Sequence, residues 1–483
     1  MLFNSITFLI FFAITLFLYY VLPFKVKWIV LLVASCVFYM WWRPEFILLI
    51  IFSAFVNYFL SGCINVSDTE KYRKIFLALC MIINFGILFI FKYAVFVNHS
   101  FMELYSYLGI EYPINDFDIV LPMGISFFTF QVSGYTIDIY KRKIKPELNF
   151  FKFMLYLMFF PQLVAGPIER AENLLKQLFE KHKFNTVNIS TGLKFMLMGY
   201  FKKVVIADRV AVLVDNVYNS TEDFGGIAFI IATLFFTFQV YCDFSGYSDI
   251  AIGCAKTFGI DLMKNFNRPY FSRSIKEFWR NWHISLSSWL RDYVYIPLGG
   301  SRCSLIRKYF NIMVTFLLSG LWHGANWTFI LWGGIHGAYQ VIGDIKNRIF
   351  KTDKPQFFIL TFFRILITFV LVAFAWIFFR ANTVSDAFYI VQNLFSDISK
   401  ITDIQYIYDI LNSIGLSIFE FVICVCLVLA LLFIELFEKR NVIHTVLNSV
   451  PFIFRFAFYY VLVIVILALG VFGNGGEFIY FQF

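Results

Sequence analysis

Two histidines, His323 and His336, lie in a long apolar stretch that reads LLSGLWHGANWTFILWGGIHG over Leu317–Gly337. An imidazole in hydrocarbon is costly, so a histidine in such a stretch commonly faces a polar interior and has a function. Imidazole exchanges a proton near neutral pH, so such a residue can act as a general acid or base. For either residue alone, a buried histidine that only bonds a neighbouring helix is an equally good interpretation.

The spacing of the two histidines predicts different roles for them. Their separation of thirteen residues along a straight helix corresponds to about 20 Å of rise and places them on largely different faces. We expect one to be chemical and the other structural, unless Gly333 and Gly334 bend the segment back. His323 follows Lys308, at the expected cytoplasmic surface, by fifteen residues, or about 22 Å of upright helix. It is therefore expected below the surface, where a cytosolic donor must reach it along a channel.

A second histidine-bearing stretch, residues 267–300, reads NRPYFSRSIKEFWRNWHISLSSWLRDYVYIPLGG. Its apolar residues recur at i, i+3, i+4 and i+7, which predicts one strongly amphipathic helix. His283 lies four residues after Trp279 on the apolar face and is expected to point into the protein. A lone histidine on such a face is more often part of the core than catalytic.

Four basic residues lie off this apolar face: Arg273, Lys276, Arg280 and Arg291. They place the helix at the cytoplasmic interface. Together with the neighbouring Lys and Arg up to Lys308, they predict a cationic mouth. Such a mouth suits anionic lipid, at about 1 kcal/mol per basic residue, or the phosphates of a soluble donor. The sequence leaves both interpretations open.

Two aspartates, Asp243 and Asp249, stand at the end of an apolar run in QVYCDFSGYSDIA, residues 239–251. Ser245 and Asp249 are four residues apart and share a helix face. Carboxylates buried here would belong to a polar interior site. A cap at the membrane interface explains them equally well.

The elements that must position these residues follow from composition. Of the 483 residues, 60% are hydrophobic and 15% are charged, with a mean hydropathy of +0.74. A soluble globule has roughly half apolar and about a quarter charged residues, so we expect an all-α, polytopic membrane protein. The net charge of +9 indicates basic cytoplasmic loops rather than nucleic-acid binding. Eight cysteines without a C-x-x-C pair predict neither disulfides nor a metal site.

Basic and acidic loops alternate along the first half of the chain. Lys and Arg follow the first, third and fifth apolar runs, whereas residues 97–118 carry four acidic residues and no Lys or Arg. This pattern predicts an outward N-terminus and a cytoplasmic side after those three runs. We expect ten to thirteen membrane segments, some of them shorter than the roughly 20 residues of a straight crossing. The runs lie near 6–22, 28–42, 46–64, 75–91, 119–139, 151–165, 190–207, 226–242, 309–322, 325–342, 357–380, 416–437 and 452–472.

The segment FFPQLVAGPIER, residues 159–170, predicts a re-entrant or broken helix, because prolines and glycines interrupt an apolar run there. No Gly/Ser linker or fixed repeat divides the chain. We therefore expect a single integral-membrane domain over 1–483. Its motif-bearing core is 119–343, flanked by transmembrane helices in 1–118 and 344–483.

Five stretches in matching order resemble the membrane-bound O-acyltransferase superfamily, in its bacterial alginate and peptidoglycan O-acetyltransferase branch. They are MGISFFTFQVSGYTIDIY (123–140), FFPQLVAGPIER (159–170), VYCDFSGYSDIAIG (240–253), FWRNWHISLSSWLRDYVYIPLGG (278–300) and FLLSGLWHGANWTFILWGGIHG (316–337). The resemblance covers about 215 residues, with the terminal helices agreeing in character, and it includes the related D-alanyl transfer proteins.

The resemblance implies a helical shell around a central tunnel in the bacterial cytoplasmic (inner) membrane. The family's catalytic histidine falls on His323 and its second histidine on His283, and His336 matches the H-G that closes the signature. Apart from the resemblance, we take His336, Asp249, Ser245 and Asn326 as possible supporting residues. The implied donor is cytosolic acetyl-CoA or an acyl carrier, with no permanently bound cofactor. The implied acceptor is an extracytoplasmic polysaccharide, often reached through a partner of the SGNH-hydrolase type. The donor phosphates would meet the basic residues Arg273, Lys276, Arg280 and Arg291.

Three other functions fit parts of the same pattern. A transporter or flippase would also have broken helices and membrane histidines, but it predicts two related halves, and none are visible. A non-catalytic scaffold of the cell envelope predicts that His323 is dispensable. D-alanyl transfer to teichoic acids from a carrier protein would change only the acyl group. Neither the acyl group, the polymer nor the oligomeric state follows from the sequence.

Overall fold

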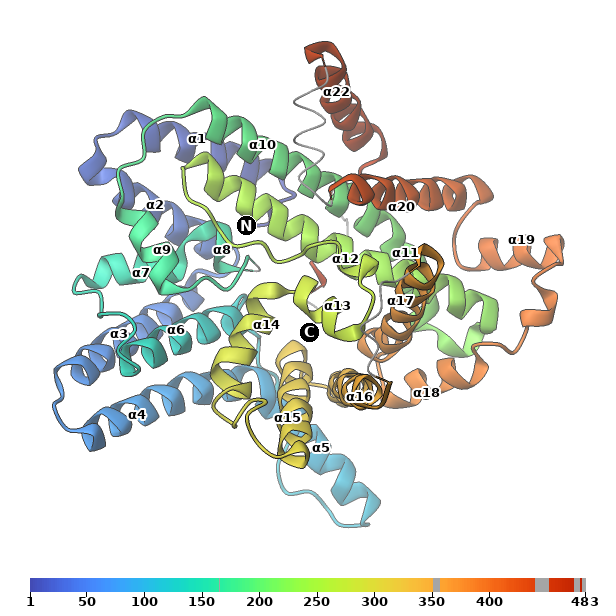
Figure 1. The fold of residues 1–483 in the computed structure, drawn as a ribbon, viewed down its shortest axis with the longest axis horizontal. Helices are drawn as coiled ribbons and strands as arrows, with labels where there is room; N and C mark the ends of the chain where they lie inside the picture. Colours follow the sequence, from blue (N-terminus) through green and yellow to red (C-terminus); the bar gives the residue numbers. More distant parts are fainter. Residues whose placement is uncertain (165, 351–356, 439–450, 473–477, 480–483) are drawn as a thin grey trace. The chain divides into compact units, whose positions relative to one another are not determined.

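The computed structural model describes every residue except 165, 351–356, 439–450, 473–477 and 480–483. The described residues form helices and loops, with no strand among them (Figure 1). Within this part of the chain, six helices are long and apolar enough to cross a membrane: Pro44–Val66, Glu70–Tyr107, Gly226–Thr257, Phe358–Arg380, Ile418–Leu436 and Phe452–Leu469. The expected all-α, multi-pass membrane protein is confirmed. Several other apolar runs form helices shorter than a straight crossing needs, and the total number of membrane segments stays a prediction.

The chain forms two compact units. One comprises Met1–Met196 with Ala251–Lys264, and the other comprises Leu197–Ile250 with Asn265–Phe483. Two of the boundaries fall inside α10 (Thr186–Tyr200) and inside α12 (Gly226–Thr257), and the third follows Lys264, in the loop after α12. The single domain expected over 1–483 stays a prediction.

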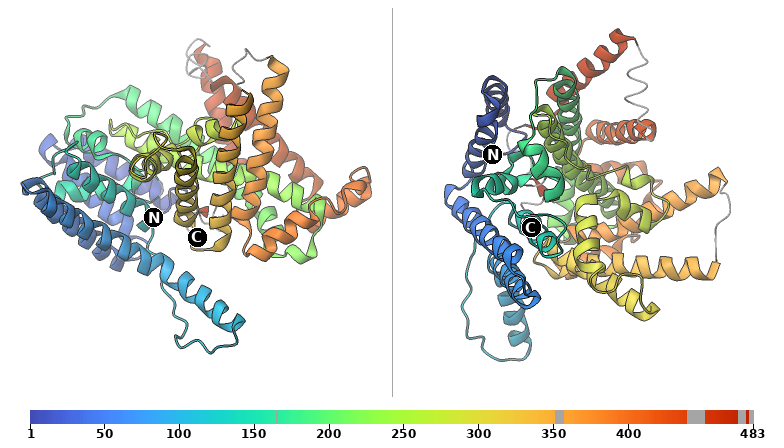
Figure 2. Two further views of the ribbon diagram at one scale, coloured as in Figure 1. Left: turned by 60° about the horizontal axis from the view of Figure 1, so that its bottom comes forward. Right: turned by 60° about the vertical axis from the view of Figure 1, so that its left-hand side comes forward.

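The first unit begins with α1 (Ile6–Val21), α2 (Phe24–Met40), η1 (Pro44–Phe46) and α3 (Ile47–Val66). Next, α4 (Glu70–Leu88), the π-helical η2 (Phe89–Tyr93) and α5 (Ala94–Tyr107) follow one another without a loop. Figure 2 shows α5 extending away from α3, α4 and α6. The unit continues with α6 (Ile125–Tyr140), α7 (Phe150–Met158), α8 (Phe160–Leu163) and α9 (Ala171–Phe179).

Buried amides join the helices of the first unit. Asn57 Nδ2 donates to Asn84 Oδ1 at 2.8 Å, and Asn84 Nδ2 donates back to Asn57 Oδ1 at 2.9 Å. Thr136 of α6 also donates to Asn57 Oδ1, at 3.1 Å. Because hydrocarbon offers no hydrogen-bond partners, such reciprocal bonds hold α3, α4 and α6 together.

The helix break expected within 159–170 is confirmed. The helix α7 ends at Met158, and Phe159 has φ −49° and ψ 106°, outside the helical region. The short α8 then begins at Phe160 with Pro161 in its first turn. Proline has no N–H to donate, so it is tolerated in the first turn of a helix and breaks a helix interior.

The second unit continues from α10 with a π-helical segment and a series of helices. They are η3 (Phe201–Ala207), α11 (Asp208–Asn219), η4 (Thr221–Asp223), α12, η5 (Pro269–Phe271), α13 (Ile275–Asn281), α14 (Ile284–Leu290), η6 (Arg291–Tyr295), α15 (Leu305–His323) and α16 (Trp327–Phe350). Further along are α17 (Phe358–Arg380), α18 (Val384–Asn393), η7 (Ile398–Lys400), α19 (Ile404–Ser413), α20 (Ile418–Glu438) and α22 (Phe452–Leu469).

The apolar stretch 317–337 is divided between two helices. The helix α15 ends at His323, residues 324–326 form a turn, and α16 starts at Trp327. The bend considered at Gly333 and Gly334 therefore lies at 324–326 instead. Gly333 lies within α16, where an added Cβ would come within 2.3 Å of Phe316 O on α15. The two helices thus pack with backbone against backbone, which requires glycine at the contact.

The single amphipathic helix expected within 267–300 is wrong, because the segment forms α13 and α14 with a break at His283. His283 has φ 42° and ψ 57°, in the left-handed region. The expected burial is nevertheless confirmed: Phe278, Trp282 and Leu286 are buried, and Lys276 is exposed. The periodicity of apolar residues predicted which side chains face inward. It did not predict that the chain changes direction at His283.

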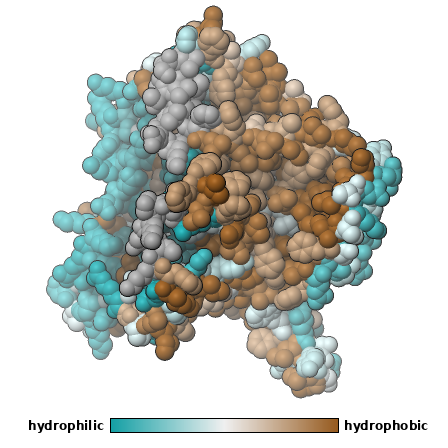
Figure 3. All heavy atoms as spheres, turned by 45° about the vertical axis from the view of Figure 1, so that its right-hand side comes forward, coloured by the Kyte–Doolittle hydropathy of each residue, from teal (hydrophilic) through white to brown (hydrophobic). Residues whose placement is uncertain are grey.

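Hydrophobic side chains cover much of the molecular face drawn in Figure 3, between hydrophilic margins. The helix α17 contributes a run of exposed apolar residues that includes Phe358, Phe362, Leu366 and Val370. A soluble protein rarely exposes a contiguous apolar surface of this kind. A lipid-facing surface explains it, since the bilayer core is itself apolar.

Candidate active site

His283 and His323 come together although forty residues separate them in sequence. Their ring centroids lie 6.3 Å apart. Both side chains are buried, at 0% and 2% exposed. From the sequence, His283 was expected to reach His323 only if the helix that carries His283 folded toward His323. The break in this helix after Asn281 allows that approach.

Aromatic rings surround the His323 imidazole. The ring centroids of Trp322 and Trp332 each lie 5.0 Å from it, and that of Phe379 lies 5.4 Å from it. These rings come from three helices, α15, α16 and α17. The position of Phe379 beside His323 could not be predicted from the sequence, because nothing distinguishes this phenylalanine from the others in its apolar run. An aromatic shell excludes bulk water, which would otherwise hydrolyse a reactive acyl group.

Asn265 holds His283 in its strained backbone conformation. The amide N–H groups of Ile284 and Ser285 donate to Asn265 O at 2.9 Å and to Asn265 Oδ1 at 3.2 Å. Asn265 Nδ2 in turn donates to Ser248 Oγ on α12 at 3.3 Å. A non-glycine residue in the left-handed region persists only where its surroundings enforce it, and such residues cluster at functional sites. Sequence reasoning missed Asn265, although its place just before the 267–300 stretch is a usable signal.

Burial also determines the charge state of His283, which lies between the short helices α13 and α14, outside the six candidate membrane-spanning helices. Desolvation lowers its pKa from 6.5 to about 3. The imidazole is therefore neutral at physiological pH. A neutral imidazole can donate one hydrogen bond and accept another.

His336 occupies a structural position. Trp279 Nε1 donates a hydrogen bond to His336 Nδ1 at 3.2 Å and links α13 to α16. The ring of Phe278 stacks on His336 with centroids 6.1 Å apart. These contacts support a structural role for His336, and the division of roles between the two histidines of 317–337 stays a prediction.

The carboxylates of α12 are engaged by consecutive lysines of the π-helical region. Lys202 Nζ lies 2.8 Å from Asp249 Oδ2. Lys203 Nζ pairs with Asp243 and lies 2.8 Å from Asp208 Oδ1. Asp243 is buried, so a polar interior explains it better than an interface cap. Ser245 is also buried, and its Oγ has no hydrogen-bond partner among the described residues. A direct role of Asp249 and Ser245 in the reaction stays a prediction.

Asn326 shapes the turn that follows His323. Its Oδ1 accepts a hydrogen bond from Thr328 N at 3.0 Å and caps α16, while its Nδ2 donates to Asn382 O at 3.0 Å. Asn382 Oδ1 accepts from Arg380, whose guanidinium also lies 2.6 Å from Asp215 Oδ1. Asn326 therefore acts on the backbone next to His323. Its catalytic role stays a prediction.

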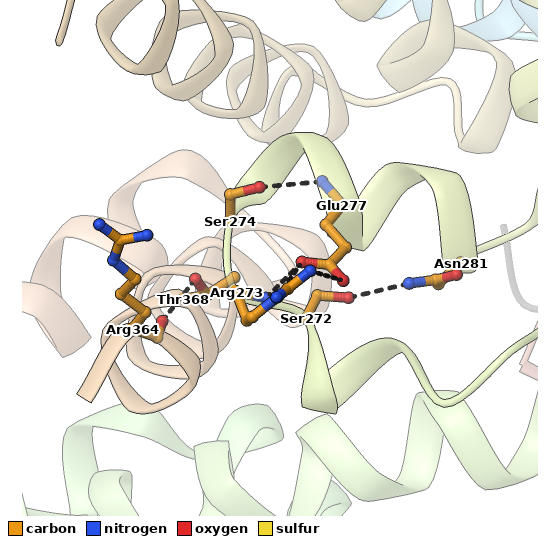
Figure 4. A network of polar contacts seen from close by, with 7 residues as sticks. All are labelled: Ser272, Arg273, Ser274, Glu277, Asn281, Arg364 and Thr368. Carbon is orange, nitrogen blue, oxygen red and sulfur yellow. Dashed lines mark hydrogen bonds and ion pairs between the residues drawn. The ribbon is translucent and has the colours of Figure 1, made fainter. Parts of the chain in front are cut away.

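The four basic residues expected to bind the donor differ in whether an acidic side chain forms an ion pair with them. Arg273 forms an ion pair with Glu277, from its Nε at 3.2 Å, as Figure 4 shows. Arg291 Nε lies 2.8 Å from Asp292 Oδ1. Lys276 and Arg280 are exposed on α13, and no acidic partner occurs for them among the described residues. These two cations are therefore the better candidates for binding phosphate.

A further cation beside this site was missed. Arg364 of α17 lies beside the Arg273–Glu277 pair, and its guanidinium points away from that pair (Figure 4). Thr368 Oγ1 donates to Arg364 O at 2.8 Å. Arg364 lies almost a hundred residues beyond Arg273, so only the packing of α13 against α17 could reveal its position. No cluster of His, Cys, Asp and Glu suited to a metal ion occurs in the described part of the chain.

Known proteins resemble this chain over most of its length. The model of the MBOAT, membrane-bound O-acyltransferase family matches residues 36–385. The probable alginate O-acetylase AlgI of Pseudomonas aeruginosa is 40% identical over 399 residues, covering 82% of this chain and 75% of the relative. The peptidoglycan O-acetyltransferase of Helicobacter pylori is 35% identical over 397 residues, covering 77% and 74%. The teichoic acid D-alanyltransferase of Streptococcus thermophilus is 30% identical over 279 residues, covering 53% and 66%.

The family match includes the α13–α14 break and the α15–α16 hairpin, and therefore both buried histidines. A transporter or a scaffold does not account for this match. The protein is an acyltransferase, and the chain belongs to the membrane-bound O-acyltransferase family.

Proposed function

We propose that this enzyme takes an acetyl group from cytosolic acetyl-CoA and delivers it for O-acetylation of an extracytoplasmic polysaccharide, such as peptidoglycan or an alginate-like exopolysaccharide. The observation that carries the proposal is the pairing of buried His283 and His323, at 6.3 Å between ring centroids, inside an aromatic shell. Two similar relatives, at 40% and 35% identity, carry the names of O-acetylating enzymes, which supports the proposal. A multi-pass protein acting between cytosol and exterior belongs in the bacterial cytoplasmic membrane.

In the proposed reaction, the acceptor hydroxyl attacks the thioester carbonyl while His323 takes up the hydroxyl proton. The carbon–sulfur bond breaks, the carbon–oxygen ester bond forms, and the coenzyme A thiolate leaves and takes a proton. His283, neutral and next to His323, orients the donor or passes that proton. Acetyl-CoA and the acceptor meet in a passage between the helices, where the aromatic rings around His323 limit hydrolysis.

The donor phosphates are proposed to bind at α13. Lys276 and Arg280 present two exposed cations there, and Arg364 adds a third from the neighbouring helix α17. The acceptor side is open to two routes, direct transfer to the polymer or relay through an SGNH-type partner protein.

D-alanyl transfer from a carrier protein is the second candidate function. The D-alanyltransferase of Streptococcus thermophilus covers 53% of this chain, against 82% for the alginate O-acetylase. This difference favours acetyl as the transferred group.

The proposal is tested with purified protein, acetyl-CoA carrying a labelled acetyl group, and peptidoglycan or alginate fragments as the hydroxyl acceptor. We expect release of coenzyme A and labelled ester product from the native chain. His323→Ala is expected to lower the rate by about 10²- to 10⁴-fold, the range typical for removing a general base. His182→Ala is the matched control, because this histidine lies outside the site and bonds Gln177 O at 2.7 Å.

Equal rates for His323→Ala and His182→Ala would remove the proposed role of His323. Release of the free carrier thiol from a D-alanyl carrier thioester, with no coenzyme A released from acetyl-CoA, would select the second function. Lys276→Gln with Arg280→Gln is expected to raise KM for acetyl-CoA and to weaken its salt dependence, since screening acts on exposed charges. An unchanged KM would place the donor elsewhere.

A further inference from the structure

The segment 94–120, which we call the arm, consists of α5 and the loop that follows it. The continuous helix Glu70–Tyr107 that leads into it has 38 residues, or about 57 Å of rise at 1.5 Å per residue. The hydrocarbon core of a bilayer is about 30 Å thick. Nearly half of this helix therefore lies outside the hydrocarbon.

The packing of α6 shows which half crosses the membrane. At one end, Arg73 Nη2 donates to Tyr140 O, the last residue of α6, at 2.5 Å. At the other end, Lys92 Nζ donates to Ser126 Oγ, in the first turn of α6, at 3.4 Å. The nineteen residue steps from Arg73 to Lys92 rise about 29 Å, one bilayer core. The arm begins where this crossing ends, and Asn98 is the buried residue of α5.

Charge places the arm on the extracytoplasmic side. The contact between Arg73 and Tyr140 brings the basic residues of 71–74 and of 141–145 to one end of the helices. Basic loops mark the cytoplasmic side. The arm lies at the opposite end and contains four acidic residues and no Lys or Arg.

Contacts within the arm hold its loop against its helix. Tyr112 Oη donates to Asn98 Oδ1 at 2.9 Å, and the rings of Tyr105 and Tyr112 lie 5.1 Å apart. His99 Nε2 and Asp116 Oδ1 lie 2.9 Å apart. The arm is thus held together by its own contacts, and it projects from its unit (Figure 2).

The surface of the arm mixes acidic and large apolar side chains. Glu103, Glu111, Asp116 and Asp118 are exposed. Exposed apolar residues surround them: Phe101, Leu104, Tyr107, Leu108, Ile110 and Ile114. Large apolar side chains gathered on a projecting surface mark an interaction site. The acidic charge disfavours an anionic lipid surface, and it disfavours the arm of a second copy through like-charge repulsion.

We propose that the arm docks an extracytoplasmic partner protein whose contact surface is basic around an apolar centre. Opposite charges steer such a partner and set its orientation, while the apolar residues are buried on contact. The role assigned to this partner, receiving the acyl group, rests on the proposed function. The docking itself does not.

The first test places p-benzoylphenylalanine at position 107, where Tyr107 is 89% exposed, and irradiates intact cells. We expect a covalent adduct with one protein that presents a basic patch. Glu103→Gln/Glu111→Gln/Asp118→Asn, which keeps the bond between His99 and Asp116, is expected to lower the adduct yield by about tenfold, as loss of electrostatic steering does. An adduct with lipid or with a second copy of this chain overturns the proposal.

A matched variant neutralises three exposed acids elsewhere in the same unit, Glu45, Glu172 and Glu180. It is expected to leave the adduct yield unchanged, and an equal fall in both variants contradicts docking at the arm. Cysteine placed at Ile110 is expected to react with a membrane-impermeant maleimide in intact cells, above the background of the native chain. Reaction only after permeabilisation refutes the extracytoplasmic placement.

Activity separates this proposal from the proposed function. The neutralised arm is expected to lower polymer acetylation in cells and to leave coenzyme A release by purified protein unchanged. Normal polymer acetylation in that variant overturns the docking role. Loss of the proposed function would instead appear as coenzyme A release that does not depend on His323.

Discussion

Substitution of Gly320 by alanine tests whether hairpin packing positions His323. Gly320 lies one helical turn before His323 on α15. A Cβ added at Gly320 would lie 2.2 Å from Phe329 O of α16, whereas ordinary contacts begin near 3.4 Å. The two helices must therefore separate locally by about 1 Å, and a displacement of this size at a reacting group costs about 10²-fold in rate. Overpacking also destabilises by about 1–3 kcal/mol.

The assay compares coenzyme A release and thermal unfolding of purified Gly320→Ala with those of Gly334→Ala. Gly334 lies on the same hairpin, and its added Cβ would meet only Leu317 Cδ2 at 3.7 Å, an ordinary contact. Alanine in a helix is favoured over glycine by about 0.5–1 kcal/mol, so this control is expected to be stable and active.

A double variant separates positioning from general damage. If Gly320→Ala acts through His323, adding it to His323→Ala should cost no further activity, because the two changes remove the same contribution. Equal rates for Gly320→Ala and Gly334→Ala would refute the reasoning. Additive losses in the double variant would show that the hairpin affects turnover by a route other than His323.

Three further predictions concern the surroundings of the histidines. Trp279→Phe leaves His336 Nδ1 without its hydrogen-bond donor and is expected to lower the free energy of unfolding by about 1–3 kcal/mol, as measured by thermal unfolding. Its loss of turnover, measured as coenzyme A release, is expected to be much smaller than that of His323→Ala. Asn265→Ala releases the turn at His283 and is expected to lower kcat more than KM for acetyl-CoA; an unchanged kcat would mean that Asn265 only supports the fold. Burial lowers the pKa of His283 from 6.5 to about 3, so the free energy of unfolding falls as the pH drops below about 6.5, by about 2 kcal/mol at pH 5. Thermal unfolding measured at pH 7.5 and at pH 5 should therefore differ less for His283→Gln than for the native chain. An equal difference in the two proteins would refute this cause.

The secondary-structure class, one helix break and the burial of several residues could be predicted from the sequence. Composition required helices, since a backbone in hydrocarbon must satisfy its own hydrogen bonds. The proline and glycine residues of 159–170 located a helix break. The apolar stripe of 267–300 identified its buried residues, including His283, because periodicity records which side of a segment avoids water. The order of five motifs indicated the family, and the match over 36–385 confirms it.

The meeting of His283 with His323 was decided by the tertiary structure. A left-handed residue at His283 turns the chain, and Asn265, from outside the motif, enforces that turn. Pairing with Glu277 likewise occupies Arg273, which the basic pattern alone counted as free. Sequence periodicity is a local property, so it determined which residues are buried. The partners that those residues meet depend on single turns and on contacts between distant segments, which only the folded chain contains.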